Sequence, residues 1–342
     1  MLSKKHIIGA LLIMVIGFSA VIGRLFYNKI YKPNTTKDGI IYIPSEAKFS
    51  EVERLVRPYL KRTKSFRWVA KIKKYNKHIK PGRFEIKKGM SNNDLVVLLR
   101  NKPKPIRVTF NNQESLPKLA GRIAQQIEAD SLSLLKAFYD EKFNTEHGFT
   151  KETALCLYLP DSYEMKWNSS AIEFQNKMLK AYKDYWNSSR LKKAKAQNLT
   201  PIEVSILASI VQKETAKTSE RKTVAGLYLN RLNNKWPLQA DPTVIFAQNL
   251  KAGKDLGIRR VYLKYLEIDS PYNTYKNQGL PPGPISMPDK STIEAVLNPE
   301  KHDYFYMCAS VSKPGSHVFA KTNAQHAVNS RKYQRWIATQ GY

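Results

Sequence analysis

One apolar run near the amino terminus constrains the fold of this chain more than any other feature. Residues 7–23 carry no charged side chain and only one small hydroxyl, Ser19, and residues 25–27 extend the run to roughly the 20 residues that a membrane-spanning helix needs. A cleaved signal peptide is the alternative, but the small residues at 17–20 lie inside the apolar run rather than after it. We therefore expect residues 1–31 to form a short cytoplasmic tip and an uncleaved transmembrane anchor. Basic residues flank the run almost equally on both sides, so the positive-inside rule gives only a weak orientation.

The length and cysteine content constrain the part of the chain beyond the anchor. At 342 residues the chain exceeds what one hydrophobic core usually organises, and its 42% hydrophobic content argues against disorder. No later stretch is as long and uncharged, so one soluble body is expected on one side of the membrane. Two cysteines, Cys156 and Cys308, exclude a disulfide scaffold and a multi-cysteine zinc site. Two buried thiols are expected, although a single bridge between them stays open.

The chain is strongly basic. Lysine and arginine number 57 against 28 acidic residues, and 57 − 28 gives a formal net charge of +29. Such a charge favours an anionic partner, which can be nucleic acid, lipid headgroups or an acidic polymer. Residues 61–83 interleave basic and aromatic side chains, a pattern that nucleic-acid-binding proteins share. Beside a predicted membrane anchor, a solvated basic face near an anionic bilayer is the favoured interpretation, and no nucleic-acid partner is expected.

Polar and proline-containing segments divide the rest of the chain. Residues 32–39 have the composition of a short linker. Pro103 and Pro105 stiffen the chain and prevent helix continuation, which indicates a boundary there. We therefore expect an α+β fold, with a small α+β unit over residues 40–104 and a larger mixed α+β domain over residues 106–342.

Apolar periodicity predicts secondary structure within both parts. Alternating residues indicate strands, and a spacing of three or four indicates helices. Ser91 is a candidate N-cap. The expected elements are strands over residues 40–43 and 84–86, helices over 49–59 and after Ser91, then a strand over 106–110, mostly helical structure over 116–143 and a helix over 182–195.

The clearest helix start in the sequence leads to a candidate catalytic group. Thr200, Pro201 and Glu203 have the spacing of a capping box with proline in the first turn. An apolar stripe follows, and its continuation by three residues reaches Glu214. The stripe consists of Val204, Leu207, Ile210 and Val211.

A carboxyl group at the end of a dry helix face has the chemistry of a general acid. Desolvation disfavours the charged form, so Glu214 is expected to have a raised pKa and to hold a proton near neutral pH. The alternative is that Glu214 lies beyond the buried face and pairs on the surface with Lys213, Lys217 or Arg221.

Three later loops have the composition of a sugar-binding cleft. Residues 238–243, 271–275 and 279–285 are rich in polar, aromatic, glycine and proline residues. Uncharged polar groups suit sugar hydroxyl and acetamido groups, and aromatic rings suit the apolar face of a pyranose. Alternatively, Asp241 starts a helix before a proline, the tyrosines belong to the core, and the last loop only forms a turn. The candidate substrate-binding residues are Gln239, Asp241, Tyr272, Asn273, Thr274 and Tyr275.

These segments, taken in order, resemble the motif series of the MltG/YceG-like endolytic murein transglycosylases. The unit over residues 40–104 is similar to the LysM-like subdomain of that family, so the likeness covers nearly the whole chain. The matching segments are residues 157–163, 207–215, 219–221, 228–232, 238–243, 272–275, 279–285 and 315–319, together with His326.

The resemblance implies a catalytic role for Glu214 and a specific activity. It implies a single-pass inner-membrane protein with a periplasmic catalytic domain. This enzyme would cleave the MurNAc-GlcNAc bond within nascent glycan strands, leave 1,6-anhydroMurNAc ends and so limit strand length. Peptidoglycan synthases and the division or elongation machinery are the implied partners, and no cofactor is expected.

Two departures from the family pattern bear on the site. Gln212 stands where family members often have another glutamate, which leaves Glu214 as the carboxylate of that segment. Cys156 and Leu157 replace a Glu-Gly pair, so any role of that lost glutamate is absent here.

Several alternatives remain open from the sequence. A hydrolytic muramidase would use Asp241 or Glu220 as a second carboxylate, whereas a non-catalytic, membrane-tethered peptidoglycan-binding scaffold would need neither. No metal site is expected, because the carboxyl-terminal histidines lack ligand spacing with the carboxylates. His317 and His326 are instead expected on a hairpin and on the final helix.

Overall fold

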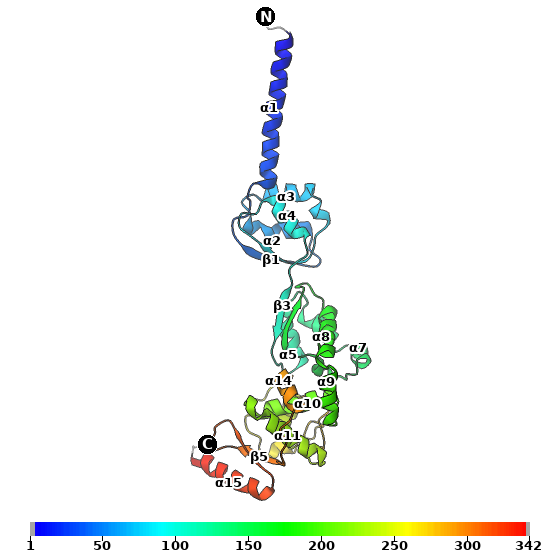
Figure 1. Ribbon diagram of the computed structural model, residues 1–342, viewed down its shortest axis with the longest axis vertical. Helices are drawn as coiled ribbons and strands as arrows, with labels where there is room; N and C mark the ends of the chain where they lie inside the picture. The colour runs from blue at the N-terminus through cyan, green and yellow to red at the C-terminus, as the bar shows by residue number, and fades with distance from the viewer. Residues whose placement is uncertain (1–3, 340–342) are drawn as a thin grey trace. The chain divides into compact units, whose positions relative to one another are not determined.

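The structure of the protein is a computed structural model, of which residues 4–339 are described. The first and last three residues, which belong to the predicted anchor segment and to the predicted domain over residues 106–342, lie outside the described part. The chain forms two compact units (Figure 1). The first unit runs to Val108 and includes Gln126–Ala129 and Tyr163–Ser170, and the second contains the rest. Helices and two-stranded sheets occur together, so the predicted α+β class is confirmed.

The amino-terminal apolar run forms helix α1, Lys4–Tyr31. Within residues 4–339 it is the one helix long and apolar enough to cross a membrane. Its apolar side chains are exposed over most of its length, Ile13 at 72% and Phe18 at 69%. Over the exposed part of α1, burial in a protein core does not stabilise the helix. This exposure of apolar side chains is expected of a segment that lipid covers.

The first unit is built on a small antiparallel sheet. Strands β1, Gly39–Ile43, and β2, Gly82–Ile86, pair with Ile41 opposite Phe84. The strands and helices predicted in this region are confirmed, with α2 ending earlier than expected and continuing as a short 3-10 helix. The unit also contains α2 (Phe49–Val56), η1 (Arg57–Tyr59), α3 (Thr63–Ile72), η2 (Tyr75–Lys77) and α4 (Asn92–Arg100).

Helix α3 lies within the basic stretch for which composition predicted no element. Its buried residues Phe66, Val69 and Ala70 recur at helical spacing and pack into the core of the unit. The lysines and arginines between them occupy the outer face, so the charge conceals a normal amphipathic helix.

The segment expected to be a linker is part of the first unit, so that prediction is wrong. Asn34 and Thr35 are buried. The Asn34 side-chain amide donates to Asn92 Oδ1 at 2.7 Å, and the Thr35 hydroxyl donates to the Lys87 carbonyl at 2.7 Å. Asn92 also donates to the Lys29 carbonyl in the last turns of α1 at 2.7 Å. The short polar composition reflects these buried hydrogen bonds rather than chain flexibility.

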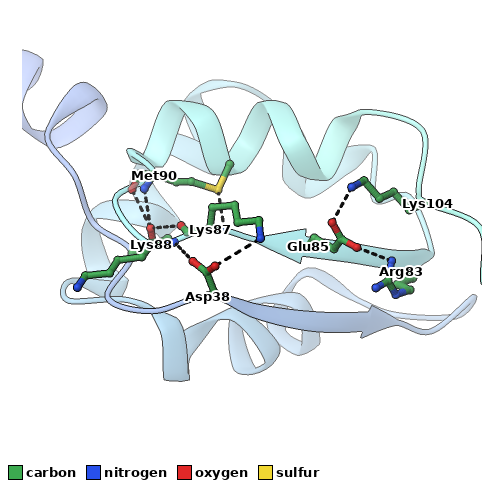
Figure 2. A network of polar contacts seen from close by, with 8 residues as sticks. Asp38, Arg83, Glu85, Lys87, Lys88, Met90 and Lys104 are labelled. Carbon is green, nitrogen blue, oxygen red and sulfur yellow. Dashed lines mark hydrogen bonds and ion pairs between the residues drawn. The ribbon is translucent and has the colours of Figure 1, made fainter.

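Acidic residues neutralise basic ones around the β1–β2 sheet (Figure 2). Asp38 accepts the Lys88 backbone N–H at 2.7 Å and pairs with the Lys87 ammonium at 3.4 Å. Glu85 pairs with Arg83 at 2.8 Å and with Lys104 at 2.6 Å. These contacts, chiefly the bond from Lys88 and that from Lys104, lower the pKa of the two carboxyl groups. The basic residues next to this sheet therefore have acidic partners.

The second unit contains more and shorter helices than expected. The predicted helical region over residues 116–143 is three helices, because Asp130 and Asp140 each cap a new one. The predicted single helix over residues 182–195 is wrong: Asn187 accepts the Arg190 backbone N–H at 3.1 Å and starts a separate helix. These helices are α5 (Leu116–Ala124), α6 (Ser131–Phe138), α7 (Glu141–Glu146), α8 (Ala171–Tyr185) and α9 (Ser188–Ala196).

Two pairs of strands belong to this part of the chain. Strand β3, Ile106–Phe110, pairs with β4, Asp161–Met165, and the division between the units passes through both strands. Strand β5, Tyr306–Ala309, forms an antiparallel hairpin with β6, His317–Ala320. His317 lies on this hairpin and His326 on the last helix, α15 (Asn323–Thr339), as predicted.

The carboxyl-terminal two-fifths of the chain contains a core of packed helices. Helices α10 (Pro201–Glu214), α11 (Arg221–Asn233) and α14 (Lys290–Leu297) pack together, with α12 (Asp241–Ala252) against α10. Cys156, in the 3-10 helix η3 (Ala154–Leu157), is buried, and Cys308 in β5 is half-buried; both thiols are free, so the open alternative of a bridge is excluded. The remaining short elements are η4 (Thr218–Glu220) and α13 (Leu263–Leu266).

Gly226 of α11 provides a test of this packing. A Cβ atom there would lie 2.4 Å from the Glu300 carbonyl oxygen and 2.8 Å from His302 Nε2. Backbone cannot move aside cheaply, so Gly226→Ala is expected to lower the free energy of unfolding by about 1–3 kcal/mol. The matched control is Gly121→Ala in α5, where nothing lies within 4 Å of the added atom. The control is expected to stabilise the protein by about 0.5–1 kcal/mol, because alanine loses less chain entropy than glycine in a helix. Urea unfolding of the detergent-solubilised chain measures both, and equal midpoints would contradict the described packing.

Candidate active site

Helix α10 begins as the sequence predicts. The Glu203 backbone N–H donates to Thr200 Oγ1 at 3.2 Å, and Glu203 Oε2 accepts the Thr200 backbone N–H at 2.8 Å. The reciprocal pair confirms the capping box and fixes the start of the helix. Every residue from Val204 to Val211 is buried, so the helix passes through the middle of the second unit's core. Glu214 is its last residue.

The Glu214 side chain is half-buried, with one carboxyl oxygen turned away from solvent. Its Oε2 atom has no exposed surface and no hydrogen-bond partner within the described residues. Burial, followed by the negative charge of Asp241, raises the pKa of Glu214 to about 7. A hydrogen bond with the Tyr228 side chain and the positive charge of Arg231 act in the opposite direction. A carboxylic acid of this kind can hold a proton at neutral pH and release it on demand.

The alternative that Glu214 pairs on the surface is wrong, because the cations proposed for it have other partners. Lys213 pairs with Glu114 at 3.2 Å. Lys217 donates to the Ser316 hydroxyl. Arg221 lies 3.6 Å from Asp289 and donates to Thr292 Oγ1 at 2.7 Å.

Two residues of α11 complete the surroundings of Glu214, and the sequence reasoning assigned no role to them. Tyr228 is buried and its pKa is well above its ordinary value, because burial and then the nearby Glu214 both disfavour its ionised form. Arg231, one turn later, is also buried, and burial lowers its pKa. It donates to the Phe305 carbonyl at 2.8 Å and to the Leu238 carbonyl. Helix α11 also carries Lys222, Asn230 and Asn233, so its composition alone did not distinguish Arg231 from a surface charge.

The loops over residues 238–243 and 271–275 are joined by hydrogen bonds. The Gln239 backbone N–H donates to the Thr274 carbonyl at 3.0 Å, and the next N–H, of Ala240, donates to Thr274 Oγ1 at 3.0 Å. Gln239 has a φ of 49°, a left-handed conformation rare for this residue type, and its side chain is exposed. The structure therefore brings two of the three predicted cleft loops together.

Asn273 and Thr274 are buried and use their side chains to hold these loops. The Asn273 amide donates to the Leu266 and Ile268 carbonyls at 2.8 and 2.9 Å and accepts the Tyr275 backbone N–H at 3.0 Å. Thr274 Oγ1 lies 2.8 Å from Thr243 Oγ1. With these partners, neither side chain presents a free polar group to a ligand.

The other candidates differ in exposure. Tyr275 donates to Asp241 Oδ1 at 2.5 Å. Burial and the Asp241 carboxylate raise the pKa of Tyr275, while Asp241 itself is exposed at the start of α12. Tyr272 is buried, and its ring centroid lies 4.8 Å from that of Phe246. Burial raises the pKa of Tyr272 to about 12. Asp241 and Tyr275 thus present polar groups whose charges influence Glu214, and Tyr272 belongs to the core.

The third predicted loop is fixed to α10. The Ile285 backbone N–H donates to Ser209 Oγ at 3.1 Å. Gln212 accepts the Asp289 backbone N–H at 2.6 Å and donates to the Met287 carbonyl at 3.3 Å. A deprotonated glutamate could not donate the second bond, so the amide at position 212 serves as a two-way clamp between α10 and the segment before α14.

A cavity of about 600 Å³ lies in the second unit, and its lining residues include neither Glu214 nor Asp241. Lys213 and Pro242, the sequence neighbours of Glu214 and Asp241, contribute to its wall, as do Phe246 and Ile285. The volume is within the range of ligand pockets, and the mixture of apolar and polar walls suits a ligand with both characters.

The Glu220 carboxylate, one of the two candidates for a second catalytic carboxylate, is bound to His317 instead. It accepts the His317 backbone N–H at 2.9 Å and lies 3.0 Å from His317 Nδ1. Burial opposes ionisation, but these bonds outweigh it and lower the pKa of Glu220. Asp241 and Glu220 are the two candidates for a second carboxylate. Of these, only Asp241 raises the pKa of Glu214. No group of three metal-ligating side chains occurs in the part of the chain that the structure describes.

Comparisons with known proteins give a consistent result. The model of the YceG-like family matches residues 41–332. The chain is 31% identical over 341 residues to the endolytic murein transglycosylase of Bacillus subtilis (strain 168), covering 94% of this chain and 91% of that protein. It is 30% identical over 293 residues to the protein of the same name from Streptococcus pneumoniae serotype 2, covering 77% of this chain but only 52% of that longer protein. A crystal structure of a YceG-like protein from Listeria monocytogenes aligns with a TM-score of 0.57 and 28% identity, over 85% of this chain and 98% of that one.

Proposed function

The chain belongs to the YceG-like family, and from this we propose that it is an endolytic murein transglycosylase. The bond cleaved is the one between MurNAc and GlcNAc inside a glycan strand of nascent peptidoglycan, and the product carries a 1,6-anhydroMurNAc end. The observation that carries the proposal is the half-buried Glu214 side chain, whose Oε2 atom has no exposed surface and whose pKa of about 7 makes it a proton donor at neutral pH.

One carboxyl group is sufficient for this reaction. Protonated Glu214 gives its proton to the glycosidic oxygen as the bond to the anomeric carbon breaks. The MurNAc C6 hydroxyl oxygen then closes on that carbon, and the Glu214 carboxylate takes the hydroxyl proton. The sugar's own hydroxyl replaces the water or the protein nucleophile that other glycosidases need, and the enzyme returns to its protonated state.

The neighbouring residues support this reaction in different ways. Tyr228 and Arg231 orient the Glu214 carboxyl and limit the rise of its pKa. Asp241, Tyr275 and the exposed Gln239 side chain would hold hydroxyl and acetamido groups of the substrate, a positioning role. Tyr272, Asn273 and Thr274 have buried side chains and would support the loops over residues 238–243 and 271–275 rather than contact the substrate.

The remaining assignments concern the setting of the reaction. We propose that α1 is a single-pass inner-membrane anchor with the catalytic domain, residues 106–342, in the periplasm. The unit over residues 40–104 would be a LysM-like module that contacts the glycan, and limiting strand length would be the physiological role. The apolar length of α1 and the family membership support this arrangement. Cooperation with peptidoglycan synthases and the division or elongation machinery follows from the same family membership.

A hydrolytic reaction is the main rival, because Asp241 lies close enough to Glu214 to raise its pKa and could activate a water. Digestion of purified, uncross-linked glycan strands in water labelled with heavy oxygen distinguishes the two. A transglycosylase gives unlabelled ends that are one water molecule lighter than a hydrolysis product and resist borohydride reduction. Labelled, reducible ends would contradict the proposal. Products of intermediate length, rather than disaccharides released from strand ends, are expected for endolytic cleavage.

A further inference from the structure

The junction between α1 and the first unit fixes the position of helix α3 relative to the apolar run. The Phe26 ring of α1 stacks on the Trp68 ring of α3 with centroids 5.3 Å apart. Asn92 donates both to the Lys29 carbonyl of α1 and to Ser65 Oγ of α3, at 2.7 and 3.0 Å. Ile30 packs against the core of the unit. Both helices belong to one compact unit, and α3 lies at the end of α1 (Figure 1).

The length of α1 places this contact at a bilayer surface. A hydrocarbon core of about 30 Å takes roughly 20 helical residues, so a span that begins at Ile7 ends near Phe26. The last turns of α1 carry Tyr27 and Tyr31, and tyrosine is a residue type that membrane interfaces favour. Because Trp68 stacks on Phe26, α3 lies at the level of the lipid headgroups.

The outer face of α3 has the composition of a headgroup-binding surface. Lys64, Trp68 and Ile72 are four residues apart and share one side of the helix, and Lys71 lies beside Ile72. Ile72 is 56% exposed and both lysines are exposed, whereas Trp68 is half-buried against the core of the unit, with the Lys29 ammonium 5.5 Å from its ring centroid. We call these four residues the α3 face. Apolar side chains flanked by lysines are typical of surfaces that rest on an anionic bilayer.

The charge of the α3 face is not neutralised by the protein. Glu53 pairs with Arg67 through contacts of 2.5–3.0 Å. Near the sheet, Asp38 pairs with Lys87 and Glu85 pairs with Lys104 (Figure 2). Lys64 and Lys71, in contrast, form no ion pair among residues 4–339. Two exposed lysines without acidic partners beside a membrane helix are available to an external anion.

We propose that the α3 face binds the headgroups of anionic phospholipids in the bilayer that α1 crosses. The lysines contact phosphate, and Trp68 and Ile72 enter the interface. This contact would hold the first unit against the membrane surface in a fixed orientation. The inference does not rest on the proposed activity, since it needs only that α1 spans the bilayer.

Hydrogen exchange of the full chain in lipid nanodiscs tests the proposal. Each basic residue near an anionic surface strengthens attachment about fivefold, so the amides of residues 63–72 should exchange at least about fivefold more slowly with roughly 30 mol % phosphatidylglycerol than with phosphatidylcholine alone. The added protection should disappear at about 1 M salt, where the screening length falls to about 3 Å. Equal exchange in the two lipids would overturn the proposal.

A charge-reversal variant and a matched control complete the test. Lys64→Glu combined with Lys71→Glu should exchange in phosphatidylglycerol at the rate seen in phosphatidylcholine. Lys192→Glu combined with Lys195→Glu changes the net charge equally on the exposed side of α9 and should behave as the wild type. Unchanged exchange of β1 and β2 verifies that the first variant is folded. Protection that requires added murein glycan instead of anionic lipid would make the α3 face a glycan-binding surface and would refute lipid binding.

Discussion

Glu214→Gln is expected to lower kcat/KM for cleavage of uncross-linked murein strands by at least about 10³-fold. A positioned general acid contributes roughly 10²- to 10⁴-fold, and here the same carboxyl serves in both halves of the reaction. Glutamine keeps the shape of the side chain but cannot donate the proton to the glycosidic oxygen. Release of anhydro-ended fragments, followed by chromatography and mass analysis, measures the rate.

The controls for this substitution separate loss of the acid from loss of the fold. Glu146→Gln changes the same residue type at an exposed position of α7 and should leave the rate unchanged. Strand binding by the Glu214→Gln variant should be retained, since the groups that hold the substrate remain. If the variant cleaves strands as fast as the wild type, Glu214 is not the acid. If the wild type itself does not cleave strands, the protein is the non-catalytic peptidoglycan-binding scaffold of the alternative hypothesis.

The rate is expected to fall as the pH rises through about 7, the pKa of Glu214 in the folded protein. Only the protonated form can act as the acid, so kcat/KM should decrease tenfold for each further pH unit. Asp241→Asn removes a negative charge that raises this pKa, and should therefore move the alkaline limb to lower pH. A profile that stays flat between about pH 6 and about pH 9 would contradict the role of Glu214.

The same ionisation affects stability. The pKa of Glu214 is higher in the folded chain, about 7, than its ordinary value of 4.5. Protonation therefore favours the folded state, and this contribution is complete below pH 4.5 and lost as the pH rises through 7. Above that range the wild type should be less stable than Glu214→Gln by about 3 kcal/mol, whereas the two should converge at low pH. Urea unfolding at several pH values measures the difference, and a pH-independent gap would indicate a packing effect of glutamine instead.

The features that the sequence predicted well are local ones. The Thr200 capping box and the apolar stripe that leads to Glu214 depend on residues three or four apart, and the structure has both. The Ser91 cap and the β1 and β2 strands follow from the same short-range rules. The break at Asn187 was missed because a helix N-cap inside a continuous helical pattern is hard to distinguish from a surface polar residue.

The features that the sequence did not predict depend on contacts between distant residues. Asn34 resembles a linker residue until Asn92, far along the chain, provides its buried partner. Asn273 has the chemistry of a sugar ligand, but its amide is used by the carbonyls of residues 266 and 268. Arg231 resembles a surface charge at the end of α11, although its guanidinium reaches carbonyls on two other segments. Such assignments require tertiary structure, because composition alone cannot state which partner satisfies a polar group.

The direct bonding of the last turns of α1 into the first unit has a consequence for biogenesis. Ile30 and the Lys29 carbonyl supply part of the core and of its buried polar network. The proposed integration of α1 into a bilayer and the folding of the β1–β2 sheet would therefore be thermodynamically coupled, since each orders residues that the other requires. A soluble version truncated at Lys32 would lose these contacts, whereas one that begins near Arg24 would retain them.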